Sequence, residues 1–129
     1  MAMNKTPLTV YTYTKCSTCR DATKWLREHG IAFDERPIRE TPPSLGELRA
    51  MLAAQGGEIR RLFNTSGMDY RAQNLAATLP GLSEAAAFEL LRGNGNLVKR
   101  PFVLGSDAHG GAIGLVGFKP DAWAKALLG

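Results

Sequence analysis

The first part of the chain carries the hydrophobic pattern of a strand, a helix and a second strand. Residues 8–13 (LTVYTY) alternate and are rich in β-formers, which predicts a strand. Helical spacing follows at Ala22, Trp25, Leu26 and His29, and Gly30 supplies a stop signal. Residues 31–36 predict the second strand. Two strands joined by a helix within about 30 residues predict a parallel βαβ unit.

The middle of the chain, about residues 41–96, predicts a helical insert. Ser44 and Glu47 have the form of a capping box, and apolar residues at helical spacing follow them. Further on, Ser83 predicts the N-cap of another helix, which ends near Gly93. The insert therefore separates the βαβ unit from the last strands of the chain.

The end of the chain predicts two more strands and a final helix. Residues 102–104 and 112–116 are apolar, and the Gly-, Ser- and Asp-rich segment between them predicts an antiparallel hairpin. Pro120 is suited to the first position of a last helix. The order βαβ, helical insert, ββα predicts a single α/β domain over residues 1–129, with a thioredoxin-like fold and a four-stranded mixed sheet.

The composition is that of an ordinary globular domain and excludes several classes of protein. With 44% hydrophobic and 22% charged residues the chain is not wholly disordered, and no apolar run approaches the roughly 18 residues of a membrane helix. The net charge is +4 without a dense Lys/Arg run, so we prefer a soluble surface to nucleic-acid binding. The start of the chain lacks the apolar segment of a signal peptide, which predicts a cytoplasmic protein.

Two cysteines lie where the first predicted strand gives way to the first helix. The N–H groups and dipole of a helix start stabilise an anion, and Lys15 and Arg20 add positive charge, so we expect Cys16 to ionise readily. Cys19, one helical turn further on, would resolve a mixed disulfide formed at Cys16. This context favours a redox pair over two buried small residues without a redox role.

A metal site is not expected at the cysteine pair. A structural zinc ion takes four ligands, and the two cysteines supply only half of them. The remaining candidates, His29 and His109, do not form the closely spaced histidine pair of such sites. We therefore predict no bound metal.

Arg100-Pro101 precedes the third predicted strand. Thioredoxin-type folds carry a cis-proline at this place, against the active cysteine, so we predict that Pro101 is the cis-proline. Arg100 would then lie near Cys16, where its guanidinium can bind an oxyanion. We prefer this role to a surface ion pair.

Separated segments of the chain resemble the arsenate reductase (ArsC)-like family and its Spx and MgsR relatives. They occur in the family's order, at residues 15–20 (KCSTCR), 62–67 (LFNTSG), 97–101 (LVKRP) and 117–120 (GFKP). The resemblance covers most of the chain and implies a thioredoxin-like fold with a helical insert. A CxxC motif such as Cys16–Cys19 is the pattern of the Spx/MgsR branch.

The resemblance also implies roles for individual residues. Cys16 matches the family's nucleophilic cysteine, which attacks arsenate in true reductases. Three arginines hold arsenate in those enzymes; Arg100 matches one of them, while Asn64 and Lys119 stand at the other two positions. Because Asn is neutral and Lys lacks the guanidinium fork, we expect weak arsenate binding.

Our leading interpretation is a cytoplasmic thiol–disulfide oxidoreductase. Cys16 would be the nucleophile, Cys19 the resolving thiol and Arg100 the anion-stabilising group. Glutathione, glutaredoxin or thioredoxin would supply the electrons, and no bound cofactor is expected. The alternatives are a Spx-like redox-sensing regulator that binds RNA polymerase, and a redox-inert binding module that keeps only the fold. The sequence leaves all three open.

Overall fold

A four-stranded sheet, in the order β2-β1-β3-β4, lies at the centre of the computed structural model, which describes residues 6–129. Its strands are β1 (Leu8–Thr12), β2 (Phe33–Pro37), β3 (Phe102–Ser106) and β4 (Ala112–Val116). β1 pairs in parallel with β2 and antiparallel with β3, and β3 and β4 form an antiparallel hairpin. The predicted α/β, thioredoxin-like fold with a four-stranded mixed sheet is confirmed.

The start of the chain, on which the expectation about a signal peptide depends, lies outside the described residues. Within residues 6–129, no helix has the length and apolar character needed to cross a membrane.

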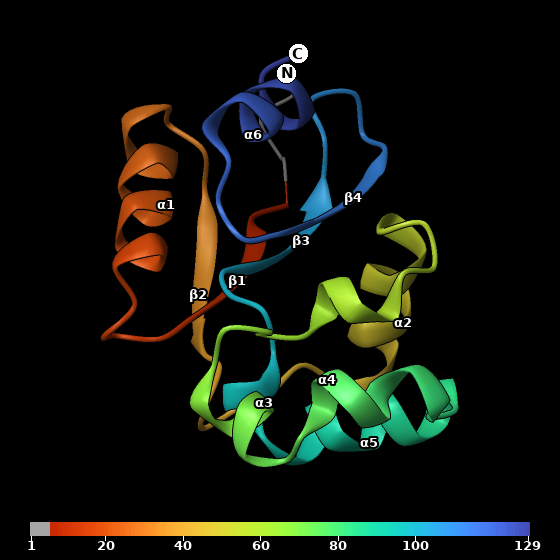
Figure 1. Cartoon of the computed structure of the whole chain (residues 1–129). Helices are drawn as coiled ribbons and strands as arrows, with labels where there is room; N and C mark the ends of the chain where they lie inside the picture. The colour runs from red at the N-terminus through yellow and green to blue at the C-terminus, as the bar shows by residue number, and fades with distance from the viewer. Residues whose placement is uncertain (1–5) are drawn as a thin grey trace.

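Helices cover both faces of the sheet (Figure 1). On one face lie α1 (Ser17–Glu28) and α6 (Pro120–Leu127), which pack against Leu8, Val10 and Val103. Side chains of a strand alternate between the two faces, so Tyr11 and Phe102 point to the other face, where the helices between β2 and β3 cover them. Burial of each such large apolar side chain stabilises the fold by about 1.5–3 kcal/mol.

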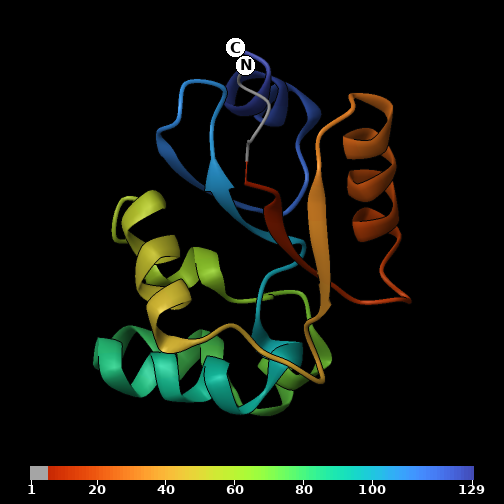
Figure 2. The same ribbon diagram turned by 180° about the vertical axis from the view of Figure 1, so that it is seen from behind.

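The segment between β2 and β3 consists of helices and turns and is gathered on the side away from the marked chain ends (Figure 2). Its elements, with η for a 3-10 helix, are α2 (Leu45–Ala54), η1 (Ile59–Leu62), α3 (Met68–Ala72), α4 (Leu75–Thr78), η2 (Leu79–Gly81), α5 (Glu84–Gly93) and η3 (Gly95–Leu97). The predicted capping box is present, because Ser44 and Glu47 each accept the other's backbone N–H. Ser83 caps α5 by accepting the N–H of Ala86.

Backbone contacts fix the insert against the sheet end where the cysteines lie. Residues 62–64 run antiparallel to residues 97–99, with hydrogen bonds from Asn64 N–H to the Leu97 carbonyl (2.7 Å) and from Lys99 N–H to the Leu62 carbonyl (2.8 Å). At Gly95 the insert approaches the chain so closely that a Cβ there would overlap the carbonyl oxygen of Ile38. These contacts bring residues 60–65 and 97–101 side by side at the carboxyl end of β1.

Candidate functional site

Cys16 lies between the carboxyl end of β1 and the start of α1. It is the N-cap residue of α1, with extended backbone angles (φ −99°, ψ 109°). Its Sγ accepts a hydrogen bond of 3.2 Å from the backbone N–H of Cys19. A sulfur in this place receives helix N–H groups and the positive end of the helix dipole, which both stabilise a thiolate. Because Cys16 is only partly buried, a reactant can approach its sulfur.

Cys19 lies in the first turn of α1 and differs from Cys16 in its surroundings. Its side chain is only 2% exposed. The pKa of its thiol is raised to about 12, chiefly by burial and then by the hydrogen bond with Cys16, while a backbone hydrogen bond with Tyr13 and the charge of Arg100 act in the opposite direction. Cys19 is therefore a protonated thiol at neutral pH. Neither cysteine forms a disulfide in the structure.

Arg100 leads into β3, and its peptide bond to Pro101 is cis. Its guanidinium lies 4.9 Å from the ring centroid of Tyr13, whose carbonyl accepts the backbone N–H of Cys16 at 3.0 Å. The charge of Arg100 also acts to lower the pKa of Cys19. The nitrogen Nη1 is buried and has no hydrogen-bond partner among residues 6–129. A buried N–H without a partner costs about 1–3 kcal/mol, so this nitrogen is well suited to a bound anion.

Arg39 is a member of the site that the sequence reasoning missed. It donates from Nη1 to the hydroxyl of Tyr13 at 2.9 Å, and its guanidinium lies 5.0 Å from the ring centroid. The ring of Tyr13 thus contacts two guanidinium groups, those of Arg39 and Arg100. A signal for this existed: residues that follow two parallel strands meet at one edge of a sheet, and Thr12 pairs with Pro37.

The other two predicted anion-binding positions line separate cavities. Asn64 lines a cavity of about 220 Å³ together with Arg100, Arg39 and the carboxylate of Asp69. Lys119 lines a cavity of about 490 Å³, which Arg100 also borders. The structure therefore brings Arg100 together with Asn64 on one side and with Lys119 on the other, but not all three around one cavity.

The predicted flanking cations, Lys15 and Arg20, both point into exposed surroundings. Arg20 donates from Nη1 to the carbonyl of Thr14 at 3.1 Å, so its guanidinium closes the loop before Cys16. Arg100 and the cations that line the two cavities add further positive charge to the site.

The two histidines lie apart from the cysteine pair. His29 follows α1 at its far end, with Nδ1 2.8 Å from the carbonyl of Trp25, and His109 Nε2 is 3.1 Å from the carbonyl of Gly129. Among residues 6–129, no group of three or more His, Cys, Asp or Glu side chains is arranged to hold a metal ion.

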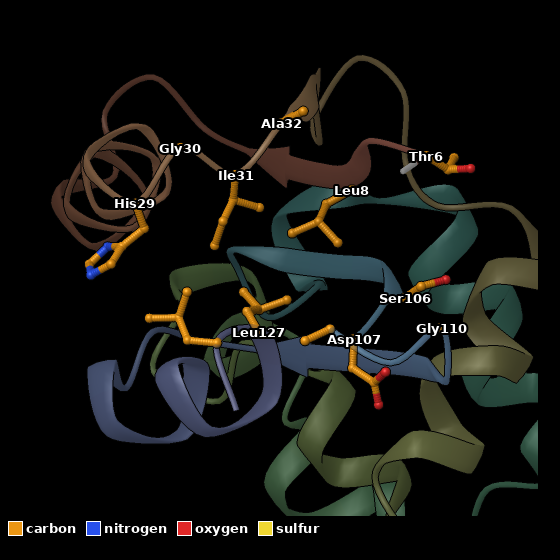
Figure 3. A pocket seen from close by; sticks show the side chains of 12 residues that line it. Thr6, Leu8, His29, Gly30, Ile31, Ala32, Ser106, Asp107, Gly110 and Leu127 are labelled. Carbon is orange, nitrogen blue, oxygen red and sulfur yellow. The ribbon is translucent and has the colours of Figure 1, made fainter. Parts of the chain in front are cut away.

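A larger cavity, of about 590 Å³, lies at the end of α1 that is remote from Cys16 (Figure 3). It is lined by residues 29–32, by Leu8 and Leu127, and by residues 106–108 of the hairpin. The 12 residues of α1 span about 18 Å, so this cavity and the cysteine pair lie at opposite ends of that helix. The carboxylate of Asp107 accepts hydrogen bonds from the backbone N–H groups of His109 and Gly111, within its own hairpin.

The comparison with known families decides where this cysteine site belongs. A model of the ArsC family matches residues 11–126 of the 129-residue chain. The chain belongs to the ArsC family. The match includes the cysteine pair, the helical insert and Arg100, so the resemblance based on separated motifs is confirmed.

Relatives of this ArsC-family chain carry different names. It is 48% identical to the uncharacterised protein YusI of Bacillus subtilis (strain 168) over 118 residues, which are 92% of this chain and 96% of YusI. It is 33% identical to the global transcriptional regulator Spx of Listeria innocua over 97 residues, 75% of this chain and 72% of Spx. A solved structure titled as a "possible arsenate reductase" of Streptococcus mutans UA159 has 38% identity and a TM-score of 0.77, covering 87% of this chain and 91% of that one.

Proposed function

We propose that this protein is a thiol–disulfide oxidoreductase in which Cys16 is the nucleophile and Cys19 the resolving thiol. The observation that carries the proposal is the difference between the two sulfurs. Cys16 is accessible and its Sγ accepts a helix N–H, whereas Cys19 is buried and the pKa of its thiol is raised to about 12. Because a thiolate attacks a disulfide and a thiol does not, Cys16 reacts first.

The reaction proceeds in two displacement steps. In the first, the Cys16 thiolate attacks one sulfur of a substrate disulfide; a new S–S bond forms, and the other substrate sulfur leaves as a thiolate that takes up a proton. In the second, Cys19 loses its proton and attacks Cys16 Sγ, which releases the remaining substrate thiol and leaves a Cys16–Cys19 disulfide. The substrate gains two electrons and the cysteine pair loses two.

The first step prepares the second. Negative charge on Cys16 is one of the causes that raise the pKa of Cys19. Formation of the mixed disulfide removes that charge, while the opposing charge of Arg100 remains. Cys19 therefore ionises more easily once Cys16 is in the mixed disulfide, which is the moment when its thiolate is needed.

An external thiol completes the cycle. Two thiols attack the Cys16–Cys19 disulfide in turn and take its place as the oxidised pair, so no bound cofactor is required. Glutathione, glutaredoxin or thioredoxin are the reductants that we propose as partners. Arg100, with its buried Nη1, would stabilise the negative charge of a leaving thiolate beside Cys16.

Cys16→Ser and Cys19→Ser form a matched pair of variants for the test. The assay follows reduction of a peptide disulfide with thioredoxin, glutaredoxin or glutathione as the electron source. We expect Cys16→Ser to reduce turnover roughly a thousandfold or more, because the nucleophile is gone. Cys19→Ser should instead accumulate a mixed disulfide at Cys16, detectable by mass spectrometry. Wild-type protein that turns over no disulfide with any of these reductants would falsify the proposal.

Arsenate should be a poor substrate of this site. Only Arg100 of the three matched positions keeps a guanidinium, and Asn64 and Lys119 line different cavities. Each missing charge-assisted hydrogen bond weakens anion binding by about 1.5–3 kcal/mol, which is tenfold or more in affinity. An assay with arsenate, glutathione and glutaredoxin checks this expectation; arsenate turnover as fast as disulfide turnover contradicts it.

A redox-sensing regulator is the second candidate, and the 33% identity with Spx favours it. The cysteine pair would then be a switch, and the protein would act by binding RNA polymerase. The test is capture of purified RNA polymerase by reduced protein, by diamide-oxidised protein and by the Cys16→Ser variant. Redox-dependent capture without any disulfide turnover replaces the enzyme with the regulator.

A further inference from the structure

The cavity of about 490 Å³ beside the cysteine pair is lined by cations from separate parts of the chain. They are Arg60 and Arg61 of η1, Lys99 and Arg100 before β3, and Lys119 before α6. No carboxylate belongs to its lining. Thr18, in the first turn of α1 and two residues after Cys16, forms part of the wall. The cavity therefore reaches the helix turn that carries both cysteines.

Most of these cations lack an intramolecular counter-charge. Arg61 pairs with Glu58, but Arg60, Lys99, Arg100 and Lys119 form no ion pair with a carboxylate among residues 6–129. Their backbones are nevertheless held together, by the Lys99 N–H bond to the Leu62 carbonyl and by the Gly117 N–H bond to the Pro101 carbonyl (2.9 Å). A concave surface of one sign concentrates the field and attracts ions of the opposite sign.

The size of the cavity indicates a ligand larger than a single oxyanion. Its volume of about 490 Å³ falls in the range of about 300–1,000 Å³ that is typical of sites for organic ligands. The cations without an ion pair come from three segments of the chain, around residues 60, 99 and 119. A ligand that carries several separated negative charges matches this distribution.

Both aromatic side chains of the cavity, Phe63 and Phe118, pack against other rings of the protein. Phe63 is 1% exposed. The ring of Phe118 makes edge contacts with Trp123 and Trp25, with centroid distances of 4.8 and 6.2 Å. Base recognition commonly uses an open aromatic face together with positive charge, and the ring of Phe63 is closed off by burial.

We propose that this cavity binds an acidic peptide segment of the partner whose disulfide reacts at Cys16. This inference rests on the proposed thiol–disulfide exchange at Cys16 and names the class of substrate for it. The segment's carboxylates contact Arg60, Lys99 and Lys119, and its path past Thr18 brings the adjoining cysteine to the start of α1. Arg100 borders the cavity and lies over the ring of Tyr13, whose carbonyl accepts the Cys16 N–H, so it joins the binding surface to the reacting sulfur.

The test uses three peptides of equal length with one central cysteine, held in a disulfide with 2-mercaptoethanol. Their flanking residues are acidic, neutral or basic. Stopped reactions with the Cys19→Ser variant give the rate constant for the mixed disulfide at Cys16. We expect the acidic peptide to react at least tenfold faster than the neutral peptide at low ionic strength, and the basic peptide to be the slowest. In 0.5 M NaCl the preference should shrink to a small factor, because salt screens exposed charges.

Substitutions in the cavity test whether it causes the preference for the acidic peptide. Arg60→Gln with Lys99→Gln should lower the acidic-to-neutral rate ratio at least fivefold. The matched control is Arg49→Gln with Lys125→Gln, which removes the same charge from exposed positions on α2 and α6 outside the cavity. An unchanged ratio in the first variant, or an equal loss in the control, overturns the cavity as the binding site.

A binding measurement separates this inference from the redox proposal. Cysteine-free versions of the three peptides, ATP and inorganic phosphate are titrated into reduced wild-type protein. The inference requires that the acidic peptide binds at least tenfold more tightly than the neutral one. It is overturned if ATP or phosphate binds more tightly than the acidic peptide, or if all peptides bind alike. Selective acidic binding without reaction at any disulfide supports the cavity assignment and overturns the oxidoreductase; equal reaction with all peptides does the reverse.

Discussion

The two ends of α1 present different kinds of surface. At its start lie an accessible thiol, a buried thiol, a guanidinium with an unpartnered buried nitrogen, and a cavity lined by cations. At its far end lies the larger cavity, with apolar residues in its lining and an Asp107 carboxylate that already accepts two backbone N–H groups. The volume is greater at the far end, and the one buried side-chain nitrogen without a partner among residues 6–129, Arg100 Nη1, is at the start.

This difference shows why cavity size alone does not locate the chemistry. Reaction at sulfur needs a stabilised thiolate and positive charge near the developing anions, and both are features of the first end. At the far end the Asp107 carboxylate accepts backbone N–H groups of its own hairpin, which is the arrangement of a structural turn. Substitutions at the first end should therefore change reactivity, and those at the far end should change mainly stability.

Among substitutions that compare the two ends of α1, the largest effect is expected for Arg100→Met, with Arg27→Met as the matched control. Both arginines lie over an aromatic ring, Arg100 over Tyr13 at 4.9 Å and Arg27 over Phe33 at 5.5 Å, but Arg27 is in the last turn of α1. Loss of a charge-assisted hydrogen bond is worth about 1.5–3 kcal/mol, so Arg100→Met should slow mixed-disulfide formation about tenfold or more. The measurement is the rate of that step in the Cys19→Ser background.

The control variant separates the effect of a positive charge at the cysteine site from the effect of the protein's overall charge. Arg27→Met should leave this rate within a factor of about two, since it removes the same charge from the opposite end of the helix. The rate of mixed-disulfide formation for Arg100→Lys should lie between those of the wild type and Arg100→Met, because lysine keeps the positive charge but lacks the planar guanidinium group. Equal effects at the two ends would remove the functional distinction between them.

A smaller effect, on stability alone, is expected at the far end for Gly30→Ala. Gly30 has φ +67° and open space around it, so the added methyl group meets only the backbone penalty of the left-handed region, about 1–2 kcal/mol. Gly46→Ala is the matched control: its surroundings are equally open and its φ is not positive, so the replacement should be neutral or stabilising by about 0.5 kcal/mol. Urea unfolding measures both values. A Gly30→Ala variant with impaired disulfide reaction would contradict the assignment of this end to structure.

The sequence was most informative where a signal is local. The alternating residues of β1, the capping box at Ser44 and the helix start at Pro120 each depend on a few neighbouring residues, and the structure has all three. The CxxC motif is equally local, because a strand before it and a helix after it place Cys16 at a helix N-cap. The four-stranded mixed sheet followed from these elements taken together, and the family followed from the separated sequence motifs.

The rest of the site depends on how distant segments pack. Arg39 reaches Tyr13 because β1 and β2 are parallel, and Arg60 approaches Lys99 because residues 62–64 pair with residues 97–99. Those pairings involve turns whose paths no local pattern determines. The family resemblance groups Asn64, Arg100 and Lys119 as one anion site; in the structure Arg100 lines both the cavity of Lys119 and that of Asn64.

The last expected effect is a pH dependence of stability that comes from Cys19. Because the pKa of this thiol is raised to about 12, the unfolded chain loses the Cys19 proton at lower pH than the folded protein does. The stabilisation that comes from the buried Cys19 thiol is therefore fully present below the usual cysteine pKa of about 8.5, and it is lost as the pH rises from there toward about 12.

We expect the free energy of unfolding of the wild type to fall more steeply between pH 8.5 and 10.5 than that of Cys19→Ala, with the same slope for both between pH 6 and 8. Tyr11, whose pKa is also raised by burial, is present in both proteins and does not affect the difference. Urea titrations in a reducing buffer give the two curves; parallel curves over the whole range would show that Cys19 ionises like an exposed thiol, and the contrast between the two cysteines on which the reaction order depends would be lost.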